Sequence, residues 1–223
     1  MEEPVSISTG SPGFDELLGG GLEPKIITQL YGEAGSGKST LALACAVSVL
    51  SSGRGVIYID TEGFSIERFK QLAGDRVEEF ALRLYLFEPE NFADQGAKIL
   101  ECSRLMQVRN IGLIVLDSAT SYYRLEQIES KDALSLLSNQ MLKLLGIAKR
   151  FNIPVIITNQ VFMDVEHNRL SGLGGTALAH ISKVIVRVEK YPGFRRAVLV
   201  KHRFMPENIA WAFRIVQTGV EDK

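Results

Sequence analysis

Short apolar runs alternate along this chain with longer stretches in which apolar positions recur at helical spacing. The short runs are rich in Val, Ile and Leu and end in polar residues, which is typical of strands buried on both faces. They predict strands at 25–31, 55–60, 82–87, 111–117 and 154–158, with helices at 38–50, 92–106 and 132–150 between them. This order predicts an α/β fold, in which helices flank a mostly parallel, twisted sheet.

The pattern changes after Gly175, where β-rich segments at 183–188, 197–202 and 210–216 follow one another closely. Tyr191-Pro192-Gly193 is a turn signal between the first two. We therefore expect an antiparallel C-terminal extension of the main sheet. Because no repeat, low-complexity tract or linker interrupts the chain, we expect one domain over residues 1–223.

Two sets of apolar positions are expected in the core. The predicted helix at 132–150 carries one stripe, made of Leu134, Leu137, Met141, Leu142 and Leu145. Cys45 and Cys102 each lie inside an apolar, helical stretch. This suits two buried thiols in a reducing compartment better than a disulfide.

Composition limits where the protein acts. Hydrophobic residues make up 46% of the chain, charged residues 23%, and the net charge is −1, so DNA binding requires a local basic patch. The longest nearly apolar run, 41–50, is far shorter than the roughly 20 residues of a membrane span. The acidic start, Glu2-Glu3, does not resemble a signal peptide. We expect a cytoplasmic protein without a membrane partner.

The motif G-x-x-x-x-G-K-[ST] occupies residues 32–39, between a predicted strand and a predicted helix. Its glycines let successive N–H groups face one anion, which suits a polyphosphate. Lys38 is expected to reach the β- and γ-phosphates of ATP, and Ser39 to complete a Mg²⁺ site. The predicted ATP-binding residues here are Gly32, Glu33, Ala34, Gly35, Ser36, Gly37, Lys38, Ser39 and Thr40.

Three further strand ends deliver polar side chains to the carboxyl edge of the predicted sheet, where ligands bind. Asp117 is expected to hold Mg²⁺ through water. Glu62 is the best placed group to orient or deprotonate the attacking water, although a solvated loop acid is the alternative. Gln160 is uncharged and can contact a γ-phosphate or its water. We therefore expect three strands to converge on one nucleotide.

The chain resembles the RecA family of archaeal and eukaryotic recombinases over nearly its whole length. The resemblance rests on Ser8-Thr9-Gly10 with 14–21, on 58–63, on 117–120 with Tyr123-Arg124, on 157–161, on 174–180, and on 203–207 with 213–215. It implies a RecA-like P-loop ATPase core in which Glu62 is the catalytic glutamate and Gln160 couples the γ-phosphate to a DNA-binding loop. By the same resemblance, Arg68 packs on adenine.

Several features of that family are missing. The chain leaves no room for a helix-hairpin-helix domain, and the linker with a phenylalanine polymerisation motif is not found. The DNA loops, at about 125–131 and 162–173, are short and include the acids Glu126, Glu129, Asp164 and Glu166 beside His167 and Arg169. The resemblance then implies an accessory repair protein that binds single-stranded DNA, hydrolyses ATP slowly and assists a full-length RadA-type recombinase. The sequence leaves open whether the protein forms a homodimer.

Residues 183–203 are a local basic stretch, in which Lys183, Arg187, Lys190, Arg195, Arg196, Lys201 and Arg203 oppose Glu189. Arg195 and Arg196 are candidates for DNA phosphates, as are Arg124 and Arg169 in the loops. Phe194 or Tyr191 can stack on a base. An ordinary solvated hairpin is the alternative.

Lys201 and Arg203 point to the same face of one strand. In RecA-like assemblies paired cations here reach the γ-phosphate of a neighbouring subunit, whereas a solvated pair is the alternative. The spacing of His167, His180 and His202 suggests no metal site.

Two other functions compete with the recombination hypothesis. A KaiC-like signalling ATPase without DNA binding shares the 9–21 segment and the Lys-x-Arg pair, although such cores usually carry paired glutamates where this chain has Thr61-Glu62. An ATP-gated protein adaptor is the third possibility.

Overall fold

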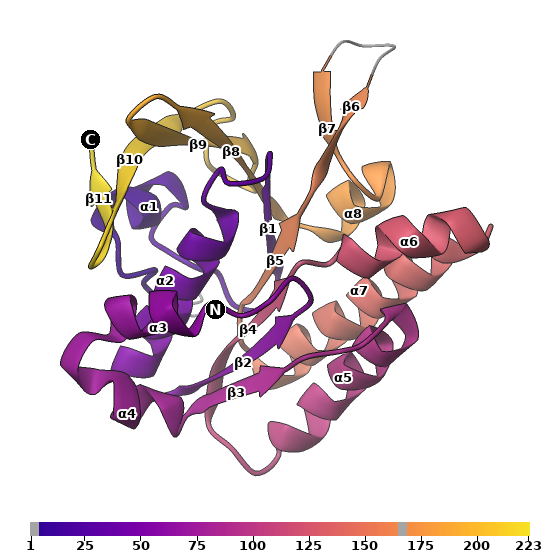
Figure 1. Cartoon of the computed structure of the whole chain (residues 1–223), viewed down its shortest axis with the longest axis horizontal. Coiled ribbons are helices and arrows are strands. Elements are labelled where there is room, and N and C mark those ends of the chain that lie inside the picture. The colour runs from indigo at the N-terminus through magenta and orange to yellow at the C-terminus, as the bar shows by residue number, and fades with distance from the viewer. Residues whose placement is uncertain (1–4, 165–168) are drawn as a thin grey trace.

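The structure is a computed structural model that describes residues 5–164 and 169–223. Residues 129, 162–164 and 169–171 are described at the backbone level only. The described strands form a nine-stranded sheet and a separate hairpin. The order in the sheet is β11-β10-β9-β8-β1-β5-β4-β2-β3 (Figure 1). The strands are β1 (Ile27–Tyr31), β2 (Gly55–Asp60), β3 (Leu84–Phe87), β4 (Ile111–Asp117), β5 (Val155–Asn159), β6 (Val161–Asp164), β7 (Arg169–Gly172), β8 (Val184–Tyr191), β9 (Phe194–Lys201), β10 (Ala210–Val216) and β11 (Gly219–Asp222).

The parallel and antiparallel parts of the sheet meet at β8. β8 pairs in parallel with β1, and the strands from β1 to β3 in the sheet order are also parallel. From β8 to β11 every pairing is antiparallel. Pro192 and Gly193 alone separate β8 from β9, and Gly193 has a φ of 80°, which the tight turn requires. The predicted sheet and its antiparallel extension are confirmed.

Helices cover both faces of the sheet (Figure 1). One apolar cluster contains side chains from α1, α2, α3 and α4, and the other contains side chains from α5, α6, α7 and α8. The helices are α1 (Pro12–Leu17), α2 (Lys38–Ser51), α3 (Ile66–Ala73), α4 (Val77–Ala81), α5 (Phe92–Leu105), α6 (Ser121–Glu129), α7 (Ala133–Phe151) and α8 (Gly175–Ile181), with a 3₁₀ turn at Gly74–Arg76.

The two segments predicted as DNA loops contain regular structure instead. Residues 121–129 form α6, because Tyr123 is buried in the second apolar cluster and anchors the helix. β6 and β7 form an antiparallel hairpin, closed at its base by the bond from Leu173 N to Gln160 O (2.9 Å). The predicted loop residues 165–168 lie outside the described residues.

The prediction for the apolar stripe of α7 is wrong at two positions. Leu137 and Met141 are fully buried and Leu145 is buried, but Leu134 is 45% exposed and Leu142 is 54% exposed. Successive residues turn by about 100° in a helix, and the buried face is centred on positions 137, 141, 144 and 148. Leu142 therefore points away from that face.

Both cysteines are free and buried, as the sequence predicts. Burial raises the pKa of the Cys102 thiol to about 12 and also raises the pKa of Cys45. Among the helices of the described residues, none has both the length and the apolar character required to cross a bilayer.

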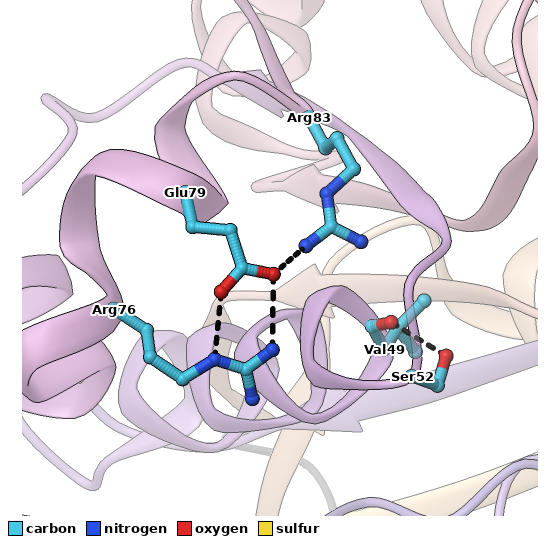
Figure 2. Close-up of polar contacts among 5 residues, drawn as sticks. All are labelled: Val49, Ser52, Arg76, Glu79 and Arg83. Atoms are coloured by element: carbon cyan, nitrogen blue, oxygen red, sulfur yellow. Dashed lines mark hydrogen bonds and ion pairs between the residues drawn. The ribbon is translucent and has the colours of Figure 1, made fainter.

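An ion-pair cluster spans α4, from Arg76 just before the helix to Arg83 just after it (Figure 2). The Glu79 carboxylate accepts hydrogen bonds from Arg76 Nε (2.8 Å) and Nη2 (3.0 Å), and also from Arg83. Near it, Ser52 Oγ donates to Val49 O (2.7 Å) at the end of α2. Since the ion pairs are solvent-exposed, they orient the entry into β3 more than they stabilise the fold.

We predict that replacing Phe213 in β10 destabilises the protein strongly. Phe213 is fully buried in the first apolar cluster, so Phe213→Ala should lower the free energy of unfolding by about 3–5 kcal/mol. Phe204→Ala is the matched control, because Phe204 is 67% exposed, and should change stability by less than about 0.5 kcal/mol. Urea unfolding of both variants measures the difference, and equal losses would contradict the packing of β10.

Candidate nucleotide-binding site

The backbone between β1 and α2 curls around a single point. Gly35 and Gly37 have φ values of 70° and 106°, a conformation that side chains with a Cβ rarely adopt. At Gly32, a Cβ would lie 2.2 Å from the carbonyl oxygen of Val188. The glycines of the motif are therefore required by the fold of the loop.

Two polar side chains inside this loop suit a phosphate. Lys38 Nζ donates to the carbonyls of Gly32 and Glu33, both at 2.9 Å. Burial lowers the pKa of Lys38, while the charges of Glu62 and Asp117 oppose that shift. Ser36 is fully buried, and its Oγ has no partner among the described residues. A phosphate oxygen can accept from both side chains, so the loop fits a polyphosphate.

Asp117, at the end of β4, is buried beside the loop. Its Oδ1 accepts from Ser39 Oγ (3.2 Å) and from Thr158 Oγ1, and its Oδ2 accepts from Tyr58 OH (2.8 Å). Burial and the Asp117 charge raise the pKa of Tyr58 well above its ordinary value. The pair of Ser39 and Asp117 offers the hard oxygen donors that Mg²⁺ prefers, and these two residues would hold the ion with the phosphates.

Glu62 and Gln160 come together from β2 and β5. Glu62 Oε1 accepts from Gln160 Nε2 (2.7 Å) and from Ser118 Oγ (2.8 Å). The backbone N–H of Gln160 donates to Thr120 Oγ1 (3.2 Å), which connects it to the residues after β4. The ends of three neighbouring strands therefore meet at this point.

A cavity of about 420 Å³ opens at this edge. Most of the predicted nucleotide residues line it, together with Arg124, a candidate for DNA phosphates. Ser36 and Asp117 lie buried behind the surface, and Glu33 faces a neighbouring cavity. The lining residues are Gly32, Ala34, Gly35, Gly37, Lys38, Ser39, Thr40, Glu62, Arg124, Gln160, Val161 and Ile215.

Sequence reasoning missed several residues of the site. Ile215 comes from β10, far from the motif in sequence, and no local sequence pattern predicts that it lines the nucleotide cavity. Tyr58 and Thr158 are polar positions inside otherwise apolar strands, and that interruption is the signal that could have identified them. Their hydroxyl groups hold the Asp117 carboxylate.

Arg68, predicted to pack on adenine, makes backbone contacts at the turn between β10 and β11. Its guanidinium donates to the carbonyls of Val216 (2.8 Å), Gln217 (3.1 Å) and Gly219 (2.9 Å). This gives Arg68 a structural role at that turn. The adenine contact stays a prediction.

The candidate DNA residues of the β8–β9 hairpin have partners within the chain. Arg196 pairs with Glu189 (2.7 Å), and Arg195 donates to Phe194 O (3.1 Å). The rings of Tyr191 and Phe194 stack on each other with centroids 4.9 Å apart. A base would have to displace this stack, and the DNA contacts stay predictions. The side chain of Arg169 lies outside the described part of the chain.

Lys201 and Arg203 lie at the edge of the sheet opposite to the phosphate cavity, because β9 runs antiparallel to β8. The prediction that both point to the same face of one strand is wrong, because β9 ends at Lys201 and Arg203 lies beyond it. Lys201 Nζ donates to Ala179 O (2.6 Å) and Ser182 O (2.9 Å). Arg203 pairs with Glu23 at 3.0 Å. A contact from either residue to a nucleotide would therefore involve a second chain, and it stays a prediction.

The sheet order, the phosphate loop and the carboxylates behind it define a RecA-like P-loop fold. A family model described as Rad51 matches residues 1–223. The chain belongs to the Rad51 family.

Its relatives include archaeal proteins named "DNA repair and recombination protein RadB". The protein of Methanoculleus marisnigri is 54% identical over 216 residues, covering 96% of each chain. That of Thermococcus kodakarensis is 42% identical, covering 97% of this chain and 99% of the relative. A solved structure, "Crystal structure of the RadB recombinase", matches with a TM-score of 0.86 and 42% identity, covering 97% of this chain and 99% of the other.

We predict that Asp60, beside this site in β2, makes stability depend on pH. Burial, with smaller contributions from Asp117, Glu88 and Glu62, raises its pKa from 3.8 to about 6, although the Gly63 N–H opposes the shift. Between about pH 4 and pH 6 the native state then holds a proton that the unfolded chain has lost, so stability falls as the pH rises.

Asp60→Asn retains an acceptor for the Gly63 N–H and removes the charge. The variant should be more stable than the wild type at pH 7, and the difference should vanish near pH 4. Thermal unfolding without nucleotide across this range measures the effect. A difference that is the same at every pH would contradict the assignment.

Proposed function

We propose that this protein is an ATP-dependent accessory factor of DNA repair and recombination that binds single-stranded DNA and assists a full-length RadA-type recombinase in the cytoplasm. One domain, residues 1–223, carries both activities. The similarity to proteins named for DNA repair and recombination supports the process. The observation that carries the mechanism is the hydrogen bond between Glu62 and Gln160.

The nucleotide role assigns a task to each group around the cavity. The loop N–H groups and Lys38 bind the phosphates, and Ser39 with Asp117 holds Mg²⁺, Asp117 through water. When bound there, Mg²⁺ would supply positive charge to neutralise the phosphate oxygens. Glu62 orients or deprotonates the attacking water.

The Glu62–Gln160 contact also supports slow hydrolysis. Glu62 Oε1 accepts from both Ser118 and Gln160. Both donors bind the same oxygen, Oε1, and hold the carboxylate toward Gln160 and Ser118. Releasing Gln160 would free Oε1 to bind the attacking water. A partner or DNA that draws Gln160 away would remove one of these donors.

The place of Gln160 in the chain supports a connection to DNA. Gln160 directly precedes β6, and its carbonyl accepts from Leu173 N at the other end of the hairpin. The hairpin formed by β6 and β7 projects away from the sheet (Figure 1). A shift of Gln160 toward a γ-phosphate would therefore move the base of a projecting segment. The positions of Lys201 and Arg203, opposite to the cavity, suit a head-to-tail contact in which one chain reaches a neighbour's nucleotide, whereas a two-fold homodimer would have to form through another surface.

We predict that two substitutions separate nucleotide binding from hydrolysis. Lys38→Ala should abolish tight Mg-ATP binding, because it removes the buried ammonium of the loop. Glu62→Gln should retain binding and lower turnover by about 10² or more. Fluorescent nucleotide binding and phosphate release measure the two effects. Unchanged affinity in the lysine variant, or normal turnover in the glutamine variant, would contradict the assigned roles.

We predict salt-sensitive, micromolar or tighter binding of labelled single-stranded DNA that changes with Mg-ATP. Fluorescence anisotropy over a salt series measures it, since phosphate contacts release counterions. Gln160→Ala should retain nucleotide binding but lose the effect of ATP on DNA affinity. Absence of DNA binding with every nucleotide would contradict this function. It would then favour a KaiC-like signalling ATPase or, if turnover were also absent, a protein adaptor.

A further inference from the structure

Two hydroxyl residues join the ends of β2 and β4 beside the phosphate cavity. Thr61 directly follows β2, and Ser118 directly follows β4. Thr61 Oγ1 donates to Ser118 O (3.1 Å) and accepts from Ser118 N (2.9 Å), and the Thr61 N–H donates to Asp117 O (2.8 Å). These bonds, which we call the Thr61–Ser118 clasp, continue the pairing of the two strands beyond Asp60 and Asp117.

The clasp holds Ser118 on one side, and β5 holds the same segment on the other. Ser118 is 1% exposed, so its N–H depends on the Thr61 hydroxyl for a partner. The next residue, Ala119, donates its N–H to Thr158 O (3.0 Å) in β5. The position of Ser118 is therefore set by the ends of three strands.

Glu62 has an exposed side chain, and its position depends on the residues around it. Thr61, before it, belongs to the clasp. Gly63, after it, donates its N–H to Asp60 Oδ2 (2.6 Å). Glu62 thus lies in a short turn that is bonded at both ends, and Ser118 Oγ donates to its Oε1 (2.8 Å).

The two donors to Glu62 Oε1 differ in how firmly they are held. Ser118 is buried within the clasp, whereas Gln160 is only partly buried and directly precedes β6. A carboxylate oxygen accepts more than one hydrogen bond. When Gln160 leaves, Ser118 can therefore still hold Oε1, and a water can take the place of the Gln160 amide.

We propose that Thr61 and Ser118 are positioning residues for ATP hydrolysis, which hold Glu62 Oε1 where it binds the attacking water. The proposal rests on the role of Glu62 in the proposed function and adds two residues to it. Because Asp117 directly precedes Ser118, the clasp also fixes Glu62 relative to the residue assigned to Mg²⁺. A displacement of about 1 Å in such an arrangement costs about 10²-fold in rate.

The test uses variants that differ by one hydroxyl. Thr61→Val keeps the branched shape of the side chain and removes both bonds between Oγ1 and Ser118. Thr61→Ser is the matched control, because it keeps the hydroxyl and loses a methyl group. Ser118→Ala removes the donor to Glu62 and leaves the clasp, so it tests the proposal even where Thr61→Val does not fold. Thermal unfolding checks each variant.

Thr61→Val and Ser118→Ala should each lower kcat by about tenfold or more, because Glu62 loses its orientation. Fluorescent nucleotide titration should give a Mg-ATP affinity within about twofold of the wild type, since neither residue contacts the phosphates in this assignment. Thr61→Ser should keep kcat within about threefold of the wild type. Damage to the fold alone would instead weaken nucleotide binding together with turnover.

A double-variant cycle checks that the clasp acts through Glu62. In a Glu62→Ala background no carboxylate is left to position, so adding Thr61→Val should change single-turnover hydrolysis of labelled ATP by less than about twofold. A loss as large as that in the wild-type background would mean that Thr61 acts on another group, and it would overturn the proposal.

The remaining outcomes separate this inference from the proposed function. Normal turnover in Ser118→Ala or in folded Thr61→Val, with impaired turnover in Glu62→Ala, would overturn the inference and leave the proposed function intact. Equal losses of Mg-ATP affinity and turnover would reduce the clasp to a structural role. Normal turnover in Glu62→Ala, or none in the wild type, would contradict the role of Glu62 and this inference together.

Discussion

The buried carboxylate of Asp117 is the constraint on which the site depends. A carboxylate removed from water is costly unless hydrogen bonds satisfy it, and three hydroxyls do so here, from α2, β2 and β5. Each of these bonds also fixes the relative position of two elements. The start of α2, which forms one side of the phosphate loop, is therefore held in register with the strands that deliver Glu62 and Gln160.

The same arrangement connects the site to the projecting hairpin. Glu62 and Gln160 share a hydrogen bond, and Gln160 directly precedes β6. Asn159, one position earlier, is fully buried and donates through Nδ2 to Leu173 O (2.9 Å). This bond connects the base of the hairpin to the end of β5, while Gln160 is only partly buried and has room to shift. A movement triggered at the phosphates can pass through Gln160 without disturbing the core.

Local sequence predicts those parts of the molecule that local physics determines. The phosphate loop needs glycines at positive φ, and β4 needs a continuous apolar run, so both elements can be predicted from the sequence alone. Ser65 accepts a hydrogen bond from Arg68 N at the start of α3, and this capping signal was available in the sequence but missed. The backbone contacts of Arg68 and the role of Ile215 depend on distant strands, and the exposed side of α7 depends on the helices that pack against it. Periodicity alone cannot supply these.

The direction of the strands explains why the two edges of the sheet present different polar groups. In the parallel part every strand ends at the same edge, where the chain turns into loops and helix N-termini that favour anions. The opposite edge has no such N–H groups, so an anion there must be attracted by side chains. Lys25, Arg54 and Lys149 come to that edge from segments distant in sequence, and β9 brings Arg203 there by running against β8. Because Lys25, Arg54 and Lys149 come close to Arg203 only in the folded chain, this cluster of cations around one cavity is a property of the topology.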